Sequence, residues 1–286
     1  MEMRTVLAVV TSGAIVVACS SFGTSESNVP ESSGSDASAD SSDVASPADG
    51  GGDAADGTTS GPFCSGPPVA TAFCASFDEG NPASFDWNGP PDINGKAGLE
   101  VIANAPGTPS APGALRATVE PSATNDCLGR AELSKTISAS RPINKVHAEF
   151  MTKVDLVSSR FSYVHLTANS ASDTGGSWQV GLSHADSVSD YSEIWNPPVG
   201  QQVGLGQGPP FSRYLLTGRW TKVAIDMTIS PPHFDVSFDD VPVASRDSAV
   251  VKELTAQGAT LAIGPLIGVC PSNTEVWFDN VRLSVE

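Results

Sequence analysis

Positive charge is scarce in this sequence. Its 286 residues include 15 Lys and Arg against 32 Asp and Glu, which gives a formal net charge of −17 at pH 7. Nucleic acids and other polyanionic surfaces are normally bound by clusters of basic residues. We therefore expect no nucleic acid among the partners of this protein.

Long hydrophobic runs are scarce too. The uncharged apolar run from Val6 to Ala18 is shorter than the roughly 20 residues of a membrane span and has the length of a signal-peptide core. It leads into Val16-Val17-Ala18-Cys19, which resembles a bacterial lipobox. The resemblance implies cleavage before Cys19, acylation of Cys19 and attachment to a lipid bilayer. Ser20 in the next position resembles lipoproteins sorted to the outer membrane. The alternatives are ordinary signal-peptide cleavage, which would secrete the protein, and an uncleaved anchor.

Composition divides the remaining chain in two. Residues 19–60 are rich in Ser, Ala, Gly and Asp, and contain no Lys or Arg. Such a segment has too few apolar groups to offset the loss of chain entropy, so we expect a disordered acidic linker. We assign residues 1–18 to the signal peptide and residues 61–286 to one folded domain, whose length suits a β-sandwich.

The cysteines indicate disulfide bonds rather than a metal cluster. The sequence has no CxxC motif and no His at metal-ligand spacing. Four cysteines remain after Cys19, and an even number in an exported chain is typical of disulfides, with three pairings open. We favour Cys64–Cys74 as a local bridge and Cys127–Cys270 as a link between distant segments.

The domain has the pattern of an all-β protein. Short alternating runs are separated by clusters of Gly, Pro, Asn and Asp. The predicted strands are Ala72–Phe77, Leu99–Ala103, Gly113–Glu120, Arg130–Ile137, Lys145–Val154, Phe161–Ala168, Ser177–Ser183, Tyr191–Trp195, Trp220–Ile229, His233–Phe238, Val241–Ser245, Thr260–Ile263 and Glu275–Val285. Only Ala249–Ala256 has a helical pattern. These strands are too many for an immunoglobulin-like unit and predict a two-sheet antiparallel jelly-roll sandwich.

Several segments resemble the concanavalin A-like lectin/glucanase superfamily, in its LamG-like form. They are Phe73-Cys74-Ala75-Ser76-Phe77-Asp78-Glu79-Gly80, Gly218-Arg219-Trp220-Thr221-Lys222-Val223, Phe234-Asp235-Val236-Ser237-Phe238-Asp239-Asp240 and Val276-Trp277-Phe278-Asp279-Asn280-Val281. The resemblance covers about residues 64–286. It implies that the first and last strands pair in one sheet and that a saccharide groove crosses a sheet.

Catalytic motifs are missing from these strands. The glucanases of the superfamily carry ExDxE or ExDxxE on one strand, and this sequence contains neither. Glycoside hydrolysis needs two carboxyl groups at a defined separation. The GxSxG motif of serine hydrolases is missing as well. We therefore expect no enzyme, and no catalytic residues.

A ligand-binding face is the better hypothesis. If strict alternation holds, only Ile194 of the run 191–195 points inward, and polar and aromatic residues of neighbouring strands share the opposite face. The candidates are Tyr163, His165, Gln179, Ser183, Tyr191, Glu193 and Trp195. Aromatic rings and amides of this kind suit a polysaccharide. The alternative is that Tyr191 and Trp195 pack beneath the Pro- and Gly-rich loop 196–210.

A structural calcium site is a second hypothesis, and no other cofactor is expected. Asp78 ends the first strand and Asp279 lies in the last, so the two carboxylates approach each other if these strands pair. The alternative is that Asp78 caps a turn and Asp279 binds local backbone.

The sequence as a whole predicts a non-catalytic, lipid-anchored cell-envelope protein with a carbohydrate-binding jelly roll. The alternatives are an envelope scaffold without a glycan ligand and a polysaccharide hydrolase or lyase.

Overall fold

Two antiparallel sheets form the described part of the chain. The computed structural model describes residues 63–64, 71–78, 87–105, 107–110, 112–120, 129–171, 175–185, 188–248, 250–267 and 273–286. Sheet A contains, in spatial order, β13 (Val241–Asp247), β12 (His233–Phe238), β11 (Thr221–Thr228), β6 (Lys145–Val157), β15 (Thr274–Val285), β4 (Gly113–Val119) and β3 (Ala97–Ala103), and β1 (Ala72–Ala75) also pairs with β15. Sheet B contains β10 (Val203–Leu205), β9 (Val188–Asn196), β8 (Ser177–Ala185), β7 (Phe161–Ser170), β14 (Ala256–Ile267), β5 (Gly129–Ser138) and β2 (Asp92–Asn94). The predicted all-β, two-sheet fold is confirmed.

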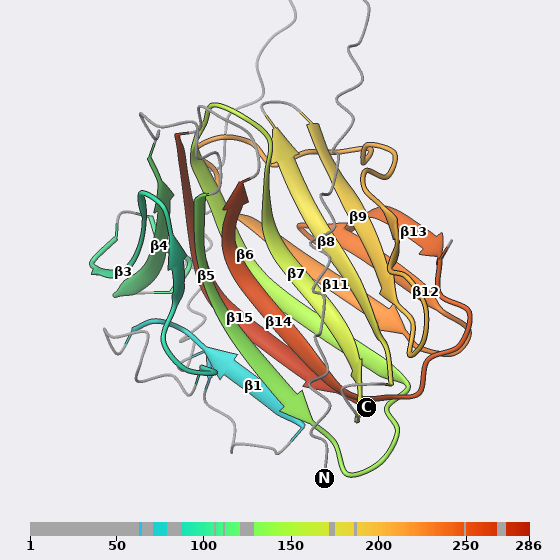
Figure 1. Ribbon diagram of the computed structural model, residues 1–286. Coiled ribbons are helices and arrows are strands. Elements are labelled where there is room, and N and C mark those ends of the chain that lie inside the picture. Colours follow the sequence, from blue (N-terminus) through green and yellow to red (C-terminus); the bar gives the residue numbers. More distant parts are fainter. Residues whose placement is uncertain are drawn as a thin grey trace, which may run out of the picture. The chain divides into compact units, whose positions relative to one another are not determined.

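The core lies between the two sheets. Figure 1 shows β7, β8 and β9 crossing in front of β6, β11 and β12. Trp178 of β8 meets Phe234 of β12 edge to face with 6.5 Å between ring centroids, and Tyr191 of β9 meets the same ring at 5.0 Å. Each large apolar side chain buried in this layer contributes about 1.5–3 kcal/mol to the free energy of unfolding.

The first and last strands of the domain pair, as the resemblance implied. Ala75 of β1 lies opposite Val281 of β15. The predicted disulfide between Cys64 and Cys74 is confirmed, with the two Cα atoms 5.7 Å apart. Arg282 donates to the carbonyl oxygen of Phe63 at 2.8 Å and places its guanidinium 3.9 Å from the centroid of that ring. The other predicted pair, Cys127 and Cys270, lies outside the described residues.

The predicted helix at 249–256 is wrong where the structure describes it. Residues 250–255 are irregular, and β14 begins at Ala256. The hydroxyl of Ser248 accepts from the backbone N–H groups of Val250 and Val251, which holds the segment as a turn.

No helix long and apolar enough to cross a membrane occurs among the described residues.

Strand β9 is oriented opposite to the prediction. The register pairs Trp178 with Trp195, Leu182 with Tyr191 and Val180 with Glu193, so these three β9 residues point into the core and Ile194 points away. The prediction failed because it treated Glu193 as a marker of the solvent side. The indole N–H of Trp178 donates to Glu193 at 3.0 Å, and the hydroxyl of Ser248 donates to the same carboxylate, so the charge is hydrogen-bonded inside the core.

A β-bulge changes the alternation of β7. Ser162 pairs with Ser183 and Val164 with Leu182, so Tyr163 is an extra residue between them. Phe161 and Tyr163 are both buried, and their rings are 6.2 Å apart. The prediction of strict alternation through Phe161–Ala168 is therefore wrong before Val164 and correct after it.

Candidate functional site

The outer surface of sheet B is polar. Alternate residues of β5, β14, β7, β8 and β9 point into the core, and the intervening residues form a continuous surface that we call the polar face. It comprises Glu132, Ser134, Thr136, Ser138, Gly258, Thr260, Ala262, Ser162, His165, Thr167, Asn169, Ser177, Gln179, Gly181, Ser183, Asp190, Ser192, Ile194 and Asn196. Hydroxyl and amide groups predominate on the polar face, and such groups can form hydrogen bonds with the hydroxyl groups of a saccharide.

His165 lies in a row of small residues. The residues paired beside it are Ala262 of β14 and Gly181 of β8. A Cβ atom added to Gly181 would lie 2.7 Å from Cδ2 of His165 and 2.7 Å from the hydroxyl oxygen of Ser192. The imidazole ring therefore extends across Gly181, and the row beside it holds no bulky side chain.

Glu132 lies beside the imidazole ring of His165. Its Oε1 lies 3.3 Å from Nδ1 of His165, and its side chain is only 3% exposed. Burial by itself would raise the pKa of Glu132, but hydrogen bonding and charge from His165 and Arg130 outweigh burial and leave the pKa below its ordinary value. The group is therefore a carboxylate, and it favours the imidazole tautomer with a proton on Nδ1 and a lone pair on Nε2.

At the end of the polar face that holds His165, two arginines cover the buried carboxylates of Glu132 and Asp190. The guanidinium of Arg130 contacts Glu132, and the guanidinium of Arg160 contacts Asp190. The arginine side chains are 42% and 32% exposed, whereas Glu132 and Asp190 are 3% and 0% exposed. The guanidinium groups therefore lie between solvent and the carboxylates of Glu132 and Asp190. A third carboxylate, that of Asp92, lies 3.0 Å from Arg130 and is itself exposed.

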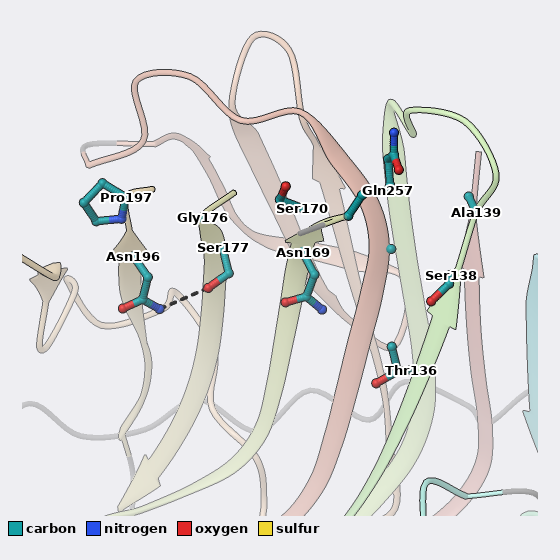
Figure 2. Close-up of a pocket in the computed structure, with 12 residues that line it drawn as sticks. Thr136, Ser138, Ala139, Asn169, Ser170, Gly176, Ser177, Asn196, Pro197 and Gln257 are labelled. Carbon is teal, nitrogen blue, oxygen red and sulfur yellow. Dashed lines mark hydrogen bonds between the residues drawn. The ribbon is translucent and has the colours of Figure 1, made fainter. Parts of the chain in front are cut away.

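A neutral pocket occupies the opposite end of the polar face. It has a volume of about 510 Å³. Figure 2 shows the side chains of Asn196, Ser177 and Asn169 side by side at the ends of β9, β8 and β7, with Thr136 and Ser138 on β5 beyond them. The amide of Asn196 donates to the hydroxyl of Ser177 at 3.1 Å. The sequence interpretation missed this pocket, because it forms from strand ends that are far apart in the chain.

The structure divides the seven predicted ligand-binding residues. His165, Gln179 and Ser183 lie on the polar face, although Ser183 is covered and lies 3.0 Å from the hydroxyl of Ser162. Four others are buried on the core side or in the bulge, namely Tyr163, Tyr191, Glu193 and Trp195. Their predicted place on the exposed face is therefore corrected.

The buried aromatic residues of β9 lie beneath the loop that follows the strand. The ring of Tyr191 stacks with Phe211 at 6.1 Å, and its carbonyl oxygen accepts from the N–H of Gly208 at 2.6 Å. A Cβ atom on Gly208 would lie 2.4 Å from the Tyr191 ring, so only glycine fits there.

Burial raises the pKa of Tyr163 far above its ordinary value, and Asp190 raises it further, so this phenol stays neutral.

The two aspartates of the calcium hypothesis bind a neighbouring loop. Asp279 accepts from the N–H of Ser110 at 3.0 Å, and Asp78 accepts from the N–H of Gly113 at 3.1 Å. Burial, with a smaller effect from Asp78, raises the pKa of Asp279 to about 6, although hydrogen bonds from Ser110 and Asn280 oppose the shift. Among the described residues no group of three or more His, Cys, Asp or Glu could hold a metal ion. The calcium site stays a prediction.

The sequence interpretation also missed the ionic end of the face. Its members are Arg130, Glu132, Arg160 and Asp190. Arg130 and Glu132 have even spacing within the predicted strand Arg130–Ile137, so one signal for a shared face was present. Nothing in the sequence pairs Glu132 with His165, because that contact depends on β14 lying between β5 and β7.

Solved structures share this fold, although no protein-family model and no curated protein matches the sequence. The crystal structure of an endo-beta-1,4-glucuronan lyase from the fungus Trichoderma reesei matches with a TM-score of 0.53 at 11% identity, over 70% of this chain and 92% of that one. The cellulose induced protein Cip1 matches with a TM-score of 0.51 at 13% identity, over 74% and 96%. The alginate lyase Aly36B matches with a TM-score of 0.48 at 10% identity, over 76% and 98%. At these identities the first two matches establish a jelly-roll fold, which fits the concanavalin A-like prediction.

The prediction of a non-catalytic protein is contradicted by this likeness, because the same architecture belongs to a polysaccharide lyase. The prediction failed for a chemical reason. The ExDxE and ExDxxE motifs supply the pair of carboxyl groups used by most glycoside hydrolases, and a search for them does not test for elimination. A lyase removes a proton and needs a positioned base, for which a single histidine suffices.

Proposed function

We propose that the polar face binds a polysaccharide containing uronate residues and cleaves it by β-elimination. The observation that carries the proposal is the position of His165. Its ring lies 3.3 Å from the buried carboxylate of Glu132, is surrounded by small neighbours, and shares its end of the face with the guanidinium groups of Arg130 and Arg160. The lyase fold of the Trichoderma reesei enzyme supports the same reaction class.

The chemistry needs a base and a cation. In a uronate the C5 hydrogen lies next to the carboxylate, and a cation on that carboxylate makes the hydrogen more acidic. We assign that cation to Arg130 and the base to Nε2 of His165. The C5–H electron pair forms the C4–C5 double bond, and the C4–O bond breaks with its electron pair on oxygen. The departing oxygen takes a proton from solvent water, and the imidazolium of His165 then returns the C5 proton to the hydroxide so formed.

The acidity of the protein does not oppose an anionic ligand at this place. The net charge of −17 lowers long-range attraction for a polyanion. Screening limits that field to roughly 8 Å at physiological ionic strength. Within that range the ligand meets the partly exposed Arg130 and Arg160, whose partners Glu132 and Asp190 are buried, and at Arg130 it also meets the exposed Asp92.

The test is turnover on a panel of polyuronides. The unsaturated product absorbs ultraviolet light, so its formation is followed directly. We expect His165→Ala to reduce kcat/KM by at least ~100-fold, as expected for loss of a general base. The matched control is His147→Ala, because His147 lies on the outer side of sheet A. Equal rates for both variants, or no product from any polyuronide with the wild-type protein, would contradict the proposal.

We also propose that Cys19 is acylated and that the protein is an outer-membrane lipoprotein. The lipobox-like Val16-Val17-Ala18-Cys19 and the following Ser20 support this proposal. Metabolic labelling with a fatty acid should mark the wild-type protein and not the Cys19→Ser variant. Label retained by that variant, or a wild-type protein found unlabelled in the medium, would favour ordinary secretion.

A further inference from the structure

The pocket at the far end of the polar face carries no charge. Hydroxyl and amide groups line it, with Gly258 and Pro197 between them, and none of its lining residues is charged. Its main polar groups come from Thr136, Ser138, Asn169, Ser177, Asn196 and Gln257. Figure 2 shows that they are spread across the width of the sheet, from β9 to β5.

Hydrogen bonds hold these amides in place. The amide nitrogen of Asn169 donates to the hydroxyl oxygen of Thr260 at 2.9 Å, and that oxygen lies 2.9 Å from the hydroxyl of Thr136. The amide of Asn196 is fixed in the same way by Ser177. An amide has two N–H donors and a carbonyl acceptor, and these bonds use one donor each. Both asparagines therefore keep a donor and an acceptor for a ligand hydroxyl.

The two ends of the face differ in what they can bind. Asn169 follows His165 by four residues on the same side of β7, which places the two about 13 Å apart along the strand. At the His165 end, arginines compensate a bound carboxylate. In the pocket a carboxylate would lose hydration with no cation to replace it, which is costly. A hydroxyl group bears a much smaller desolvation cost and finds matched partners.

We propose that the pocket is a subsite for a neutral sugar residue, and that the substrate is an acidic heteropolysaccharide. A uronate lies at His165, and an uncharged sugar of the same chain lies in the pocket. This inference rests on the proposed elimination at His165, and it adds the substrate class. A polymer made only of uronate residues would place a carboxylate in the neutral pocket.

The experiment compares two polymers of equal length. One is a homopolyuronide, and the other carries isolated uronate residues, each separated from the next by at least three neutral hexoses. We expect kcat/KM of the wild-type full-length protein to be at least ~10-fold higher on the mixed polymer, because a buried unpaired charge is discriminated strongly. The variant Gln257→Lys adds a cation to the pocket and should reduce this ratio to about 1. The control Thr217→Lys adds the same charge at an exposed turn outside the pocket and should leave the ratio unchanged.

A binding measurement separates the two proposals. A neutral hexose tetrasaccharide, titrated calorimetrically into the His165→Ala protein, tests the pocket without turnover. We expect binding that Asn196→Ala weakens at least ~5-fold, corresponding to loss of about one hydrogen bond. Elimination that is equally fast on both polymers and unaffected by Gln257→Lys would overturn the pocket assignment alone. Failure to eliminate, with the tetrasaccharide still bound in the pocket, would overturn the elimination alone.

Discussion

Each sheet of this protein buries one carboxylate whose pKa is displaced, and the two displacements have opposite signs. Glu132 of sheet B lies against His165 and Arg130, and its pKa is lowered in spite of burial. Asp279 of sheet A has only uncharged donors from Ser110 and Asn280, and its pKa is raised to about 6. Burial alone favours the neutral acid, and the interactions of Glu132 with His165 and Arg130 reverse that preference. The comparison distinguishes a carboxylate kept ionised by its neighbours from a carboxyl group that binds a loop through uncharged donors.

The largest effect we expect concerns Asp279. Its pKa rises from 3.8 to about 6 on folding, so the folded state binds the proton more tightly. The free energy of unfolding should therefore fall by about 3 kcal/mol as the pH rises from about 3 to about 7. Denaturant unfolding of the wild-type protein and Asp279→Asn across this range measures the effect. The variant should lack this part of the fall, and parallel curves would contradict the assignment.

The same unfolding measurement, repeated with added calcium, tests the predicted calcium site. An ion bound at Asp78 and Asp279 would favour the ionised carboxylates. Added calcium should then abolish the loss of stability between pH 4 and pH 7, and a chelator should restore it. If calcium does not change the pH dependence of the free energy of unfolding, the predicted calcium site is wrong, and Asp279 serves to anchor the loop.

The second effect concerns Glu132. Glu132→Gln removes the charge that fixes the tautomer of His165, and we expect kcat/KM on a polyuronide to fall by ~100-fold with a shifted pH–rate profile. The pKa of Glu132 is lowered on folding, so its contribution to stability is present above pH 4.5 and is lost as the pH falls further. The matched control is Glu149→Gln, which removes a carboxylate that contacts Lys222 on sheet A. Similar losses of activity in both variants would refute a special role for Glu132.

The third effect concerns the small residue beside His165. Gly181→Ala adds a methyl group where the imidazole now lies, and we expect kcat/KM to fall about 10-fold while the melting temperature changes little, since flexible side chains can move aside. Gly98→Ala is the control, because its methyl group would meet only the hydroxyl of Thr118 on sheet A, at 3.3 Å. An unchanged rate for Gly181→Ala would show that the ring position does not limit the reaction.

The smallest effect concerns the outer side of sheet A. His147 lies 2.8 Å from Asp226, and that hydrogen bond raises the pKa of the imidazole. The contribution of this pair to the free energy of unfolding is therefore complete below about pH 6.5, and it is lost as the pH rises through the raised pKa of His147. Both side chains are exposed, so Asp226→Asn should cost about 0.5 kcal/mol or less at pH 6 and nothing at pH 9. A loss that persists at pH 9 would mean that the pair acts through packing.

The sequence predicted the sheets better than the site. Periodicity located most strands, because residues such as Val223, Ile225 and Met227 alternate strictly. It missed the short edge strands β2 and β10, which are only three residues long. It failed in β9 because Glu193 is hydrogen-bonded in the core by Trp178 and Ser248, two partners remote in the chain. The pairing of Glu132 with His165 was equally hidden, since it is set by strand order and not by local pattern.

The bulge in β7 determines which of its residues lie on the polar face. Ser162 and His165 are separated by an odd number of positions and yet share one surface, because Tyr163 resets the phase of the pleat between them. The neighbouring β14 is irregular at the same level, between Ile263 and Leu266. Both irregularities lie between the level of Ser162 and the level of His165. Deleting one residue at the bulge would turn Ser162 to the opposite surface while leaving the orientation of His165 and Asn169 unchanged.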